Sequence, residues 1–177
     1  MTDAAAGRTS PATGGLDRAA LSTYLNDHLA GAVAGSHRMR RTAEALARTP
    51  VGPGLTRVAD EVEGEREELR ALIGDLDLVQ ARPKQVATWA GERLARLKTS
   101  GAGLQREPLT ALLEVELLRS AVVGKRGLWQ TMTALAPALG VDADRCRELW
   151  GQTDRQVATL DEVHDYVRSR VLREAAR

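Results

Sequence analysis

Aromatic side chains are scarce in this 177-residue chain: they make up 3% of it, and phenylalanine is absent. A hydrophobic core must therefore be built from leucine, valine and alanine, and two of these, alanine and leucine, are strong helix formers. The single cysteine excludes a disulfide framework and a cysteine-rich zinc module. A formal net charge of +1 excludes a partner recognised through a strong overall charge. Together these features predict one compact all-α domain.

A targeting signal and a membrane-spanning run are also missing. Residues 1–20 contain no basic stretch followed by an apolar one, as a secretory signal would. The most apolar stretch, residues 109–123, is interrupted by Glu114, Glu116 and Arg119. Crossing a bilayer requires about 20 mostly apolar residues, so this stretch is too polar. We therefore expect a cytoplasmic protein with no membrane association.

Apolar residues recur at helical spacing in four long segments. These segments are residues 17–49, 55–76, 108–135, and 142 or 144 to the C-terminal residues. Prolines and glycines separate them: residues 50–54 should end the first helix, and Pro137 with Gly140 should end the third. Residues 1–16 are small and polar, which predicts a flexible tail before a single helical-bundle domain of residues 17–177.

The connection between the second and third helices is much longer than the other two. It contains an amphipathic pattern from Pro83 to Lys98, which predicts a short helix that begins at the proline. Short connections imply antiparallel neighbours, whereas the long one can return the third helix parallel to the second. Short, long, short is the connectivity of ferritin-like bundles. We expect a ferritin-like four-helix bundle with a long 2–3 crossover, and an up-down bundle with an elaborated loop is the alternative.

Charge is distributed unevenly along the chain. Residues 55–77 contain eight acidic and three basic side chains, whereas residues 82–107 contain six basic and two acidic ones. We interpret this as a solvated acidic helix face beside a crossover that complements it. The basic segment carries one aromatic residue, Trp89, which makes a poor stacking platform for bases. Nucleic acid is therefore not an expected partner.

Candidate metal ligands follow from what a ferritin-like site requires. Such a site uses a glutamate from each of two helices and a Glu-x-x-His pair from each of the other two. Asp161 and His164 have the i, i+3 spacing that places both on one helical face, with His164 on the apolar stripe. In the third helix we expect Glu116 to face inward and Glu114 to point away. Glu65 is the acid closest to the apolar stripe of the second helix.

This ligand set is incomplete, because the second helix has no histidine and the first has no inward glutamate near its middle. One hypothesis is a reduced site in which Glu116, Asp161, His164 and Glu65 hold iron or manganese. The other is a buried polar network of Glu116 and His164, joined by Arg66, which flanks the stripe and could pair with an acid there. Such a network can fix the register of a leucine-rich bundle.

Two further features bear on binding. Gly31 and Gly35 form a small-x-x-x-small pair, which predicts close packing against a neighbouring helix or the crossover, and a homodimer contact is the alternative. Tyr24, Asn26 and His28 are candidates for lining a small pocket. A pocket for a small ligand between the helices is therefore a third functional hypothesis, beside the scaffold and the metal protein.

Two motifs resemble a known group. Residues 24–31 (YLNDHLAG) and 124–129 (GKRGLW) are similar to a group of uncharacterised actinobacterial ferritin-like proteins, over most of residues 20–170. Iron-containing ferritin-like relatives imply Glu116, Asp161 and His164 as the matching ligands, with Glu65 a weaker match.

Our leading interpretation is a non-catalytic scaffold or interaction protein that kept the bundle, has a degenerate metal site and needs no cofactor. The alternative is a metal-binding protein or oxidoreductase that uses the reduced carboxylate–histidine site with iron or manganese. The sequence leaves open whether the chain is an enzyme, and it identifies neither a substrate nor a protein partner.

Overall fold

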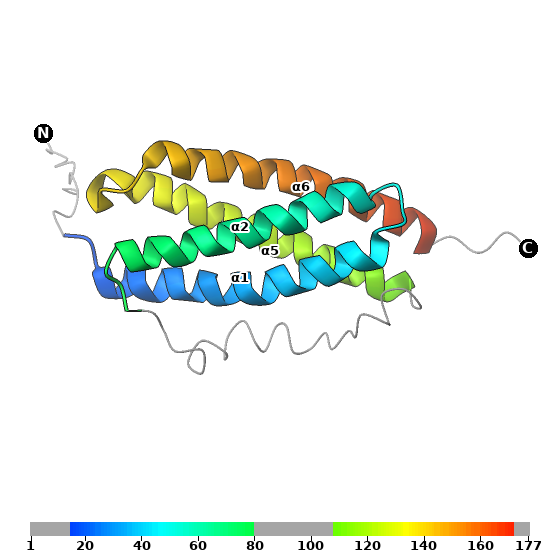
Figure 1. The fold of residues 1–177 in the computed structure, drawn as a ribbon, viewed down its shortest axis with the longest axis horizontal. Helices are drawn as coiled ribbons and strands as arrows, with labels where there is room; N and C mark the ends of the chain where they lie inside the picture. The colour runs from blue at the N-terminus through cyan, green and yellow to red at the C-terminus, as the bar shows by residue number, and fades with distance from the viewer. Residues whose placement is uncertain (1–14, 80–107, 172–177) are drawn as a thin grey trace, which may run out of the picture.

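The computed structural model describes residues 15–79 and 108–171, which form four α-helices and no strand (Figure 1). The helices are α1 (Arg18–Leu46), α2 (Gly52–Asp75), α5 (Pro108–Leu139) and α6 (Ala143–Val171). The predicted all-α four-helix architecture is confirmed. The expected short helix at residues 83–98 and residues 1–14 of the expected tail (residues 1–16) lie outside the described residues, as do residues 172–177.

The helix ends follow local chemistry. Asp17 caps α1, since its carboxylate accepts hydrogen bonds from the amides of Ala19 and Ala20 at 3.0 Å. The carboxylate of Asp142 does the same at the start of α6, where it accepts from the amides of Asp144 (2.8 Å) and Arg145 (3.1 Å). These oxygens satisfy amides that have no partner within the helix.

The end of α5 differs from the sequence-based expectation. Pro137 lies inside the helix, which continues to Leu139. A proline this close to the end removes one backbone hydrogen bond without stopping the last turn. The stop comes at Gly140, whose φ of 68° is left-handed, and the amide of Val141 then donates to the carbonyl of Ala136 at 3.2 Å.

Side-chain contacts define how the helices are arranged. Around the bundle the order is α1, α2, α6, α5, so each helix packs against two neighbours. The hydroxyl of Tyr24 donates to Thr131 at 3.3 Å near the start of α1 and the end of α5. Arg145, early in α6, pairs with Glu68, late in α2. All neighbours are therefore antiparallel, and the diagonal pair α2 and α5 runs in one direction (Figure 1).

The hydrophobic core consists of two clusters, one toward each end of the bundle. One cluster comprises Met39, Ala43, Leu55, Val58, Ala59, Val62, Ala111, Leu112, Val115, Leu118, Val122, Leu160, Val163 and Val167. The other comprises Leu21, Leu25, Leu69, Ile73, Leu76, Leu78, Leu128, Trp129, Met132, Cys146 and Leu149. Between Leu25 and Met39, α1 contributes no buried hydrophobic side chain. We call the level between the clusters the central layer; it includes Gly31, Gly35, Glu65, Lys125 and Gln156.

No helix within the described ranges is long and apolar enough to span a membrane.

Replacing Gly140 with alanine should lower the free energy of unfolding by about 1 kcal/mol, because a Cβ is unfavourable in the left-handed conformation. Chemical denaturation followed by circular dichroism measures this change. Gly64→Ala is the matched control: Gly64 is exposed in the middle of α2, and an added Cβ meets nothing within 4 Å. That variant should be more stable by about 0.5–1 kcal/mol. Equal effects of the two substitutions would contradict this account of the α5 end.

Candidate functional site

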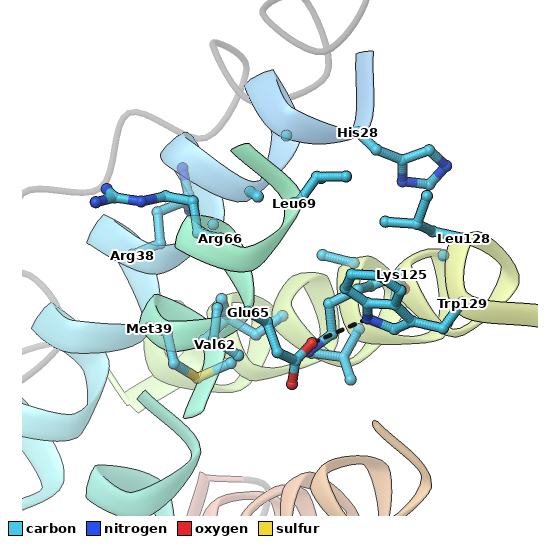
Figure 2. A pocket seen from close by; sticks show the side chains of 18 of the residues that line it. His28, Arg38, Met39, Val62, Glu65, Arg66, Leu69, Lys125, Leu128 and Trp129 are labelled. Carbon is cyan, nitrogen blue, oxygen red and sulfur yellow. Dashed lines mark hydrogen bonds and ion pairs between the residues drawn. The ribbon is translucent and has the colours of Figure 1, made fainter. Parts of the chain in front are cut away.

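A cavity of about 450 Å³ lies in the central layer, between α1, α2 and α5 (Figure 2). Its wall is largely apolar, and Met39, Val62, Leu69, Leu118 and Leu128 contribute to it. In Figure 2, Arg38 and Arg66 lie on one side of the cavity, and His28, Leu128 and Trp129 lie on the other. The cavity therefore has a largely apolar wall that also carries charged groups, among them Arg38, Arg66, Glu65 and Lys125.

Three glycines contribute to the wall of this cavity. Gly31 and Gly35 of α1 and Gly124 of α5 all line it, and a Cβ added at any of the three meets nothing within 4 Å. Among the described helices, Gly31 and Gly35 do not pack closely against a neighbour. The other predicted contact, with the crossover, falls on residues outside the described ranges. Glycine in a helix can allow close approach, but here it leaves space instead.

The three residues expected to line a pocket, Tyr24, Asn26 and His28, have different surroundings. His28 lines the cavity, and its ring packs edge-on against that of Tyr24, with the ring centroids 4.6 Å apart. Burial lowers the pKa of His28, while the nearby charge of Asp27 acts in the opposite direction. Asn26 instead donates to the carbonyl of Val79 at 3.0 Å and helps to hold the segment after α2.

Beside the cavity, the carboxylate of Glu65 is the centre of a buried polar network. The Glu65 side chain is 2% exposed, and four donors from α5 and α6 surround its two oxygens. Oε2 accepts from Lys125 Nζ at 2.5 Å and from the indole Nε1 of Trp129 at 3.2 Å (Figure 2). Oε1 accepts from Nε2 of Gln156 at 2.7 Å and from Nε2 of Gln152 at 3.0 Å. The carboxylate charge is thus balanced by the ammonium group, and each of the two oxygens accepts two hydrogen bonds.

Gln156 links three helices through this network. Its Oε1 accepts from Lys125 Nζ at 2.5 Å, and its Nε2 also donates to Oε2 of Glu61 at 3.0 Å. Burial lowers the pKa of Lys125, and the negative charges of Glu65 and Glu61 oppose that effect. Since desolvation penalises the ammonium form, the pair with Glu65 is what keeps this charge tolerable inside the bundle.

A second buried ion pair joins α1 to α5. Nε of Arg38 donates to Oε1 of Glu114 at 2.8 Å, and the second guanidinium nitrogen bonds the other carboxylate oxygen. This pair overturns the predicted orientation of α5, because Glu114 is buried and the side chain of Glu116 is 47% exposed. Leucines lie on the exposed as well as the buried side of the first turns of α5, so this part has no clear polar face, and the partner on α1 decides which acid turns inward.

The four predicted metal ligands are not gathered at one place. Nε2 of His164 lies 3.2 Å from Oε1 of Glu116, so these two do meet. Asp161 is bound by Arg119, whose Nε donates to Oδ1 at 2.7 Å, and Glu65 lies in the central layer instead. Among the residues described, no three histidine, cysteine, aspartate or glutamate side chains are grouped closely enough to hold a metal ion.

Sequence reasoning found Glu65 but missed its partners. Lys125 and Trp129 share a face at i, i+4 spacing, as do Gln152 and Gln156, and each pair lies beside buried apolar residues. That spacing was the available signal, since a polar side chain among core positions needs a buried partner. Arg66 does pair with acids of α2, Glu63 and Glu67, but these are partly exposed, and it does not join the pair of Glu116 and His164 as the predicted network required.

Neutralising the central carboxylate should be costly. Glu65→Gln leaves the Lys125 ammonium without a buried counter-charge, so the free energy of unfolding should fall by about 3–5 kcal/mol. In a Lys125→Met background the same change should cost much less, because no charge is then stranded. Urea denaturation of the wild type, both single variants and the double variant measures the coupling. If Glu65→Gln lowers the free energy of unfolding equally in both backgrounds, the two side chains are not coupled and this account of the network is wrong.

No family model, no curated protein and no solved structure matches this chain. Evidence about function therefore comes from the cavity and the central network themselves. A largely apolar cavity with a few polar groups in its wall can bind a small molecule. In the adjacent network, both oxygens of the Glu65 carboxylate already accept hydrogen bonds from protein donors, so this carboxylate is not free to bind a metal ion or a ligand.

Proposed function

We propose that this chain is a ferritin-like four-helix bundle that binds a small, largely apolar ligand between α1, α2 and α5. The cavity itself is the observation that carries this proposal, because its volume of about 450 Å³ is typical of ligand pockets. Such pockets measure about 300–1,000 Å³, and a few polar groups in an apolar wall orient the ligand.

The glycines support a binding role for the cavity. Glycine within a helix costs about 0.5–1 kcal/mol relative to alanine, and three of the residues that line the cavity are helical glycines. A chain selected only for stability would carry larger side chains at these positions. Local rules of stability are most often broken at functional sites.

The ferritin-like part of the proposal rests on chain direction. Short connections join α1 to α2 and α5 to α6, and α2 and α5 run in the same direction on opposite corners of the bundle (Figure 1). Bundles with one long crossover between the second and third helices have this arrangement.

The residues present do not fit the two-metal centre that ferritin-like bundles are known for. That centre requires carboxylates and imidazoles from all four helices. In the central layer the Glu65 carboxylate instead faces an ammonium, two amide groups and an indole N–H, all of which are donors. We propose that Lys125 supplies the positive charge at this level and that the metal site is degenerate. The chain would then act by binding a ligand rather than by redox catalysis.

Filling the cavity should abolish ligand binding. In Gly35→Leu the new side chain occupies the space beside α5, so the affinity for an apolar probe such as Nile red should fall by about tenfold or more. Probe fluorescence measures this affinity. Gly64→Leu is the matched control, since Gly64 is exposed on α2 and does not line the cavity. Failure of the wild-type protein to bind any apolar probe, or equal binding by Gly35→Leu, would overturn the proposal.

The metal content of the purified protein tests the alternative hypothesis of a carboxylate–histidine metal site. Protein purified without a histidine tag and incubated with ferrous iron or manganese should retain far less than one metal ion per chain. His164→Ala and Glu116→Ala should leave the small amount that is bound unchanged. Stoichiometric metal that is lost in both variants would instead favour the reduced carboxylate–histidine site.

A further inference from the structure

The charged groups on the cavity wall differ in how well they are partnered. Three lining side chains are cationic: Arg38, Arg66 and Lys125. The first and the last are each paired with a carboxylate that is almost fully buried, Glu114 and Glu65 respectively. A ligand that reached Lys125 would also meet the carboxylate of Glu65, so neither of these two cations is open to a new anion.

Arg66 is held in a different way. Its side chain is 15% exposed, but its two carboxylate partners, Glu63 and Glu67, are 43% and 51% exposed. Both ion pairs use the same terminal nitrogen, Nη2. Exposed ion pairs of this kind are weak because water and salt screen them. These partners therefore leave Arg66 able to bind another anion.

One donor of Arg66 also lacks an acceptor. Among the described residues, its Nε is buried and has no hydrogen-bond partner. A buried donor without an acceptor is unfavourable. A hydrogen bond from this donor to a ligand would therefore stabilise the complex without breaking an existing hydrogen bond. Arg66 lies on α2 between Val62 and Leu69, both of which line the cavity. Arg66 itself is also one of the residues that line the cavity.

The opposite side of the cavity favours an uncharged group. His28, Leu128 and Trp129 lie there, across from Arg66 (Figure 2). Because burial lowers the pKa of His28, its ring is neutral near pH 7. The indole N–H of Trp129 is already bound to Glu65. A ligand that spans the cavity therefore meets a cation at one side and an apolar surface at the other.

We propose that the ligand is an aliphatic monocarboxylate, whose alkyl chain packs on the apolar wall and whose carboxylate accepts a hydrogen bond from Nε of Arg66. This inference rests on the proposed ligand-binding function and specifies the class of ligand. A hydrogen bond from the guanidinium Nε to a carboxylate is charge-assisted, and such bonds are about twice as strong as those between neutral groups. A single negative charge fits better than the double charge of a phosphate, because Glu63 and Glu67 lie against the same guanidinium.

Three probes with the same alkyl chain separate the contribution of the head-group charge from that of the alkyl chain. They are decanoate, decanol and decyltrimethylammonium, each used below its critical micelle concentration. Displacement of Nile red from the full-length wild-type chain measures their affinities. We expect decanoate to bind about tenfold tighter than decanol, as a charge-assisted hydrogen bond would give, and the cation to bind most weakly.

Two variants test the role of Arg66. Arg66→Met keeps an apolar stem and removes the guanidinium, so the preference for decanoate over decanol should disappear while decanol still binds. Retained decanol binding also shows that the variant has folded with its cavity intact. Arg70→Met is the matched control, because Arg70 pairs with the same Glu67 but does not line the cavity. It should keep the preference. Should Arg66→Met lose all binding, Arg66→Gln provides a smaller change, and the same loss of preference is expected.

The outcomes distinguish the two proposals. If none of the three probes binds, the proposed ligand-binding function itself fails. If decanol binds the wild type as tightly as decanoate, the cavity binds ligands but the carboxylate inference is overturned. If Arg66→Met keeps the preference for decanoate, or if Arg70→Met loses it to the same extent, Arg66 is not the group that recognises the anion.

Discussion

The structure depends on the need to satisfy one buried carboxylate. A glutamate inside a leucine-rich bundle is tolerated only when hydrogen bonds and a counter-charge replace its hydration. Glu65 obtains these from α5 and α6, so α2, α5 and α6 are joined at one level of the bundle. Apolar packing above and below is non-directional. Directed hydrogen bonds are satisfied in one register only, and the network therefore sets how these helices align.

The remaining helix, α1, contributes glycines rather than polar side chains to the central layer, and the cavity lies beside it. Through Arg38, which lines the cavity, α1 is tied to Glu114 of α5, but at the level of Glu65 it carries glycine. The central layer therefore has a polar half, where the Glu65 carboxylate accepts four hydrogen bonds, and another half that contains the cavity with its largely apolar wall. A bundle with this division has a rigid polar support beside an open binding volume, which is why we favour ligand binding over catalysis at a metal.

Much of the fold was predictable, and the limits have physical causes. Helical periodicity located all four helices, and glycine and proline located their connections to within a few residues. The orientation of α5 was not predictable from its own residues, because apolar side chains surround this helix and Glu114 and Glu116 look equivalent. Only Arg38, on another helix, distinguishes them. In α2 a single apolar stripe is clear, so Glu65 was correctly placed inward and Arg66 beside it.

The sequence by itself determined the helical class, the helix lengths and which positions of α2 face the core, since these depend on period, propensity and local caps. Tertiary structure alone decided which polar residues meet. Lys125 is sixty residues from Glu65 along the chain, and the Gly31 and Gly35 positions become a cavity only because nothing from α5 fills the space opposite. Contacts between helices depend on their relative rotation and translation, and no pattern within a single helix encodes either.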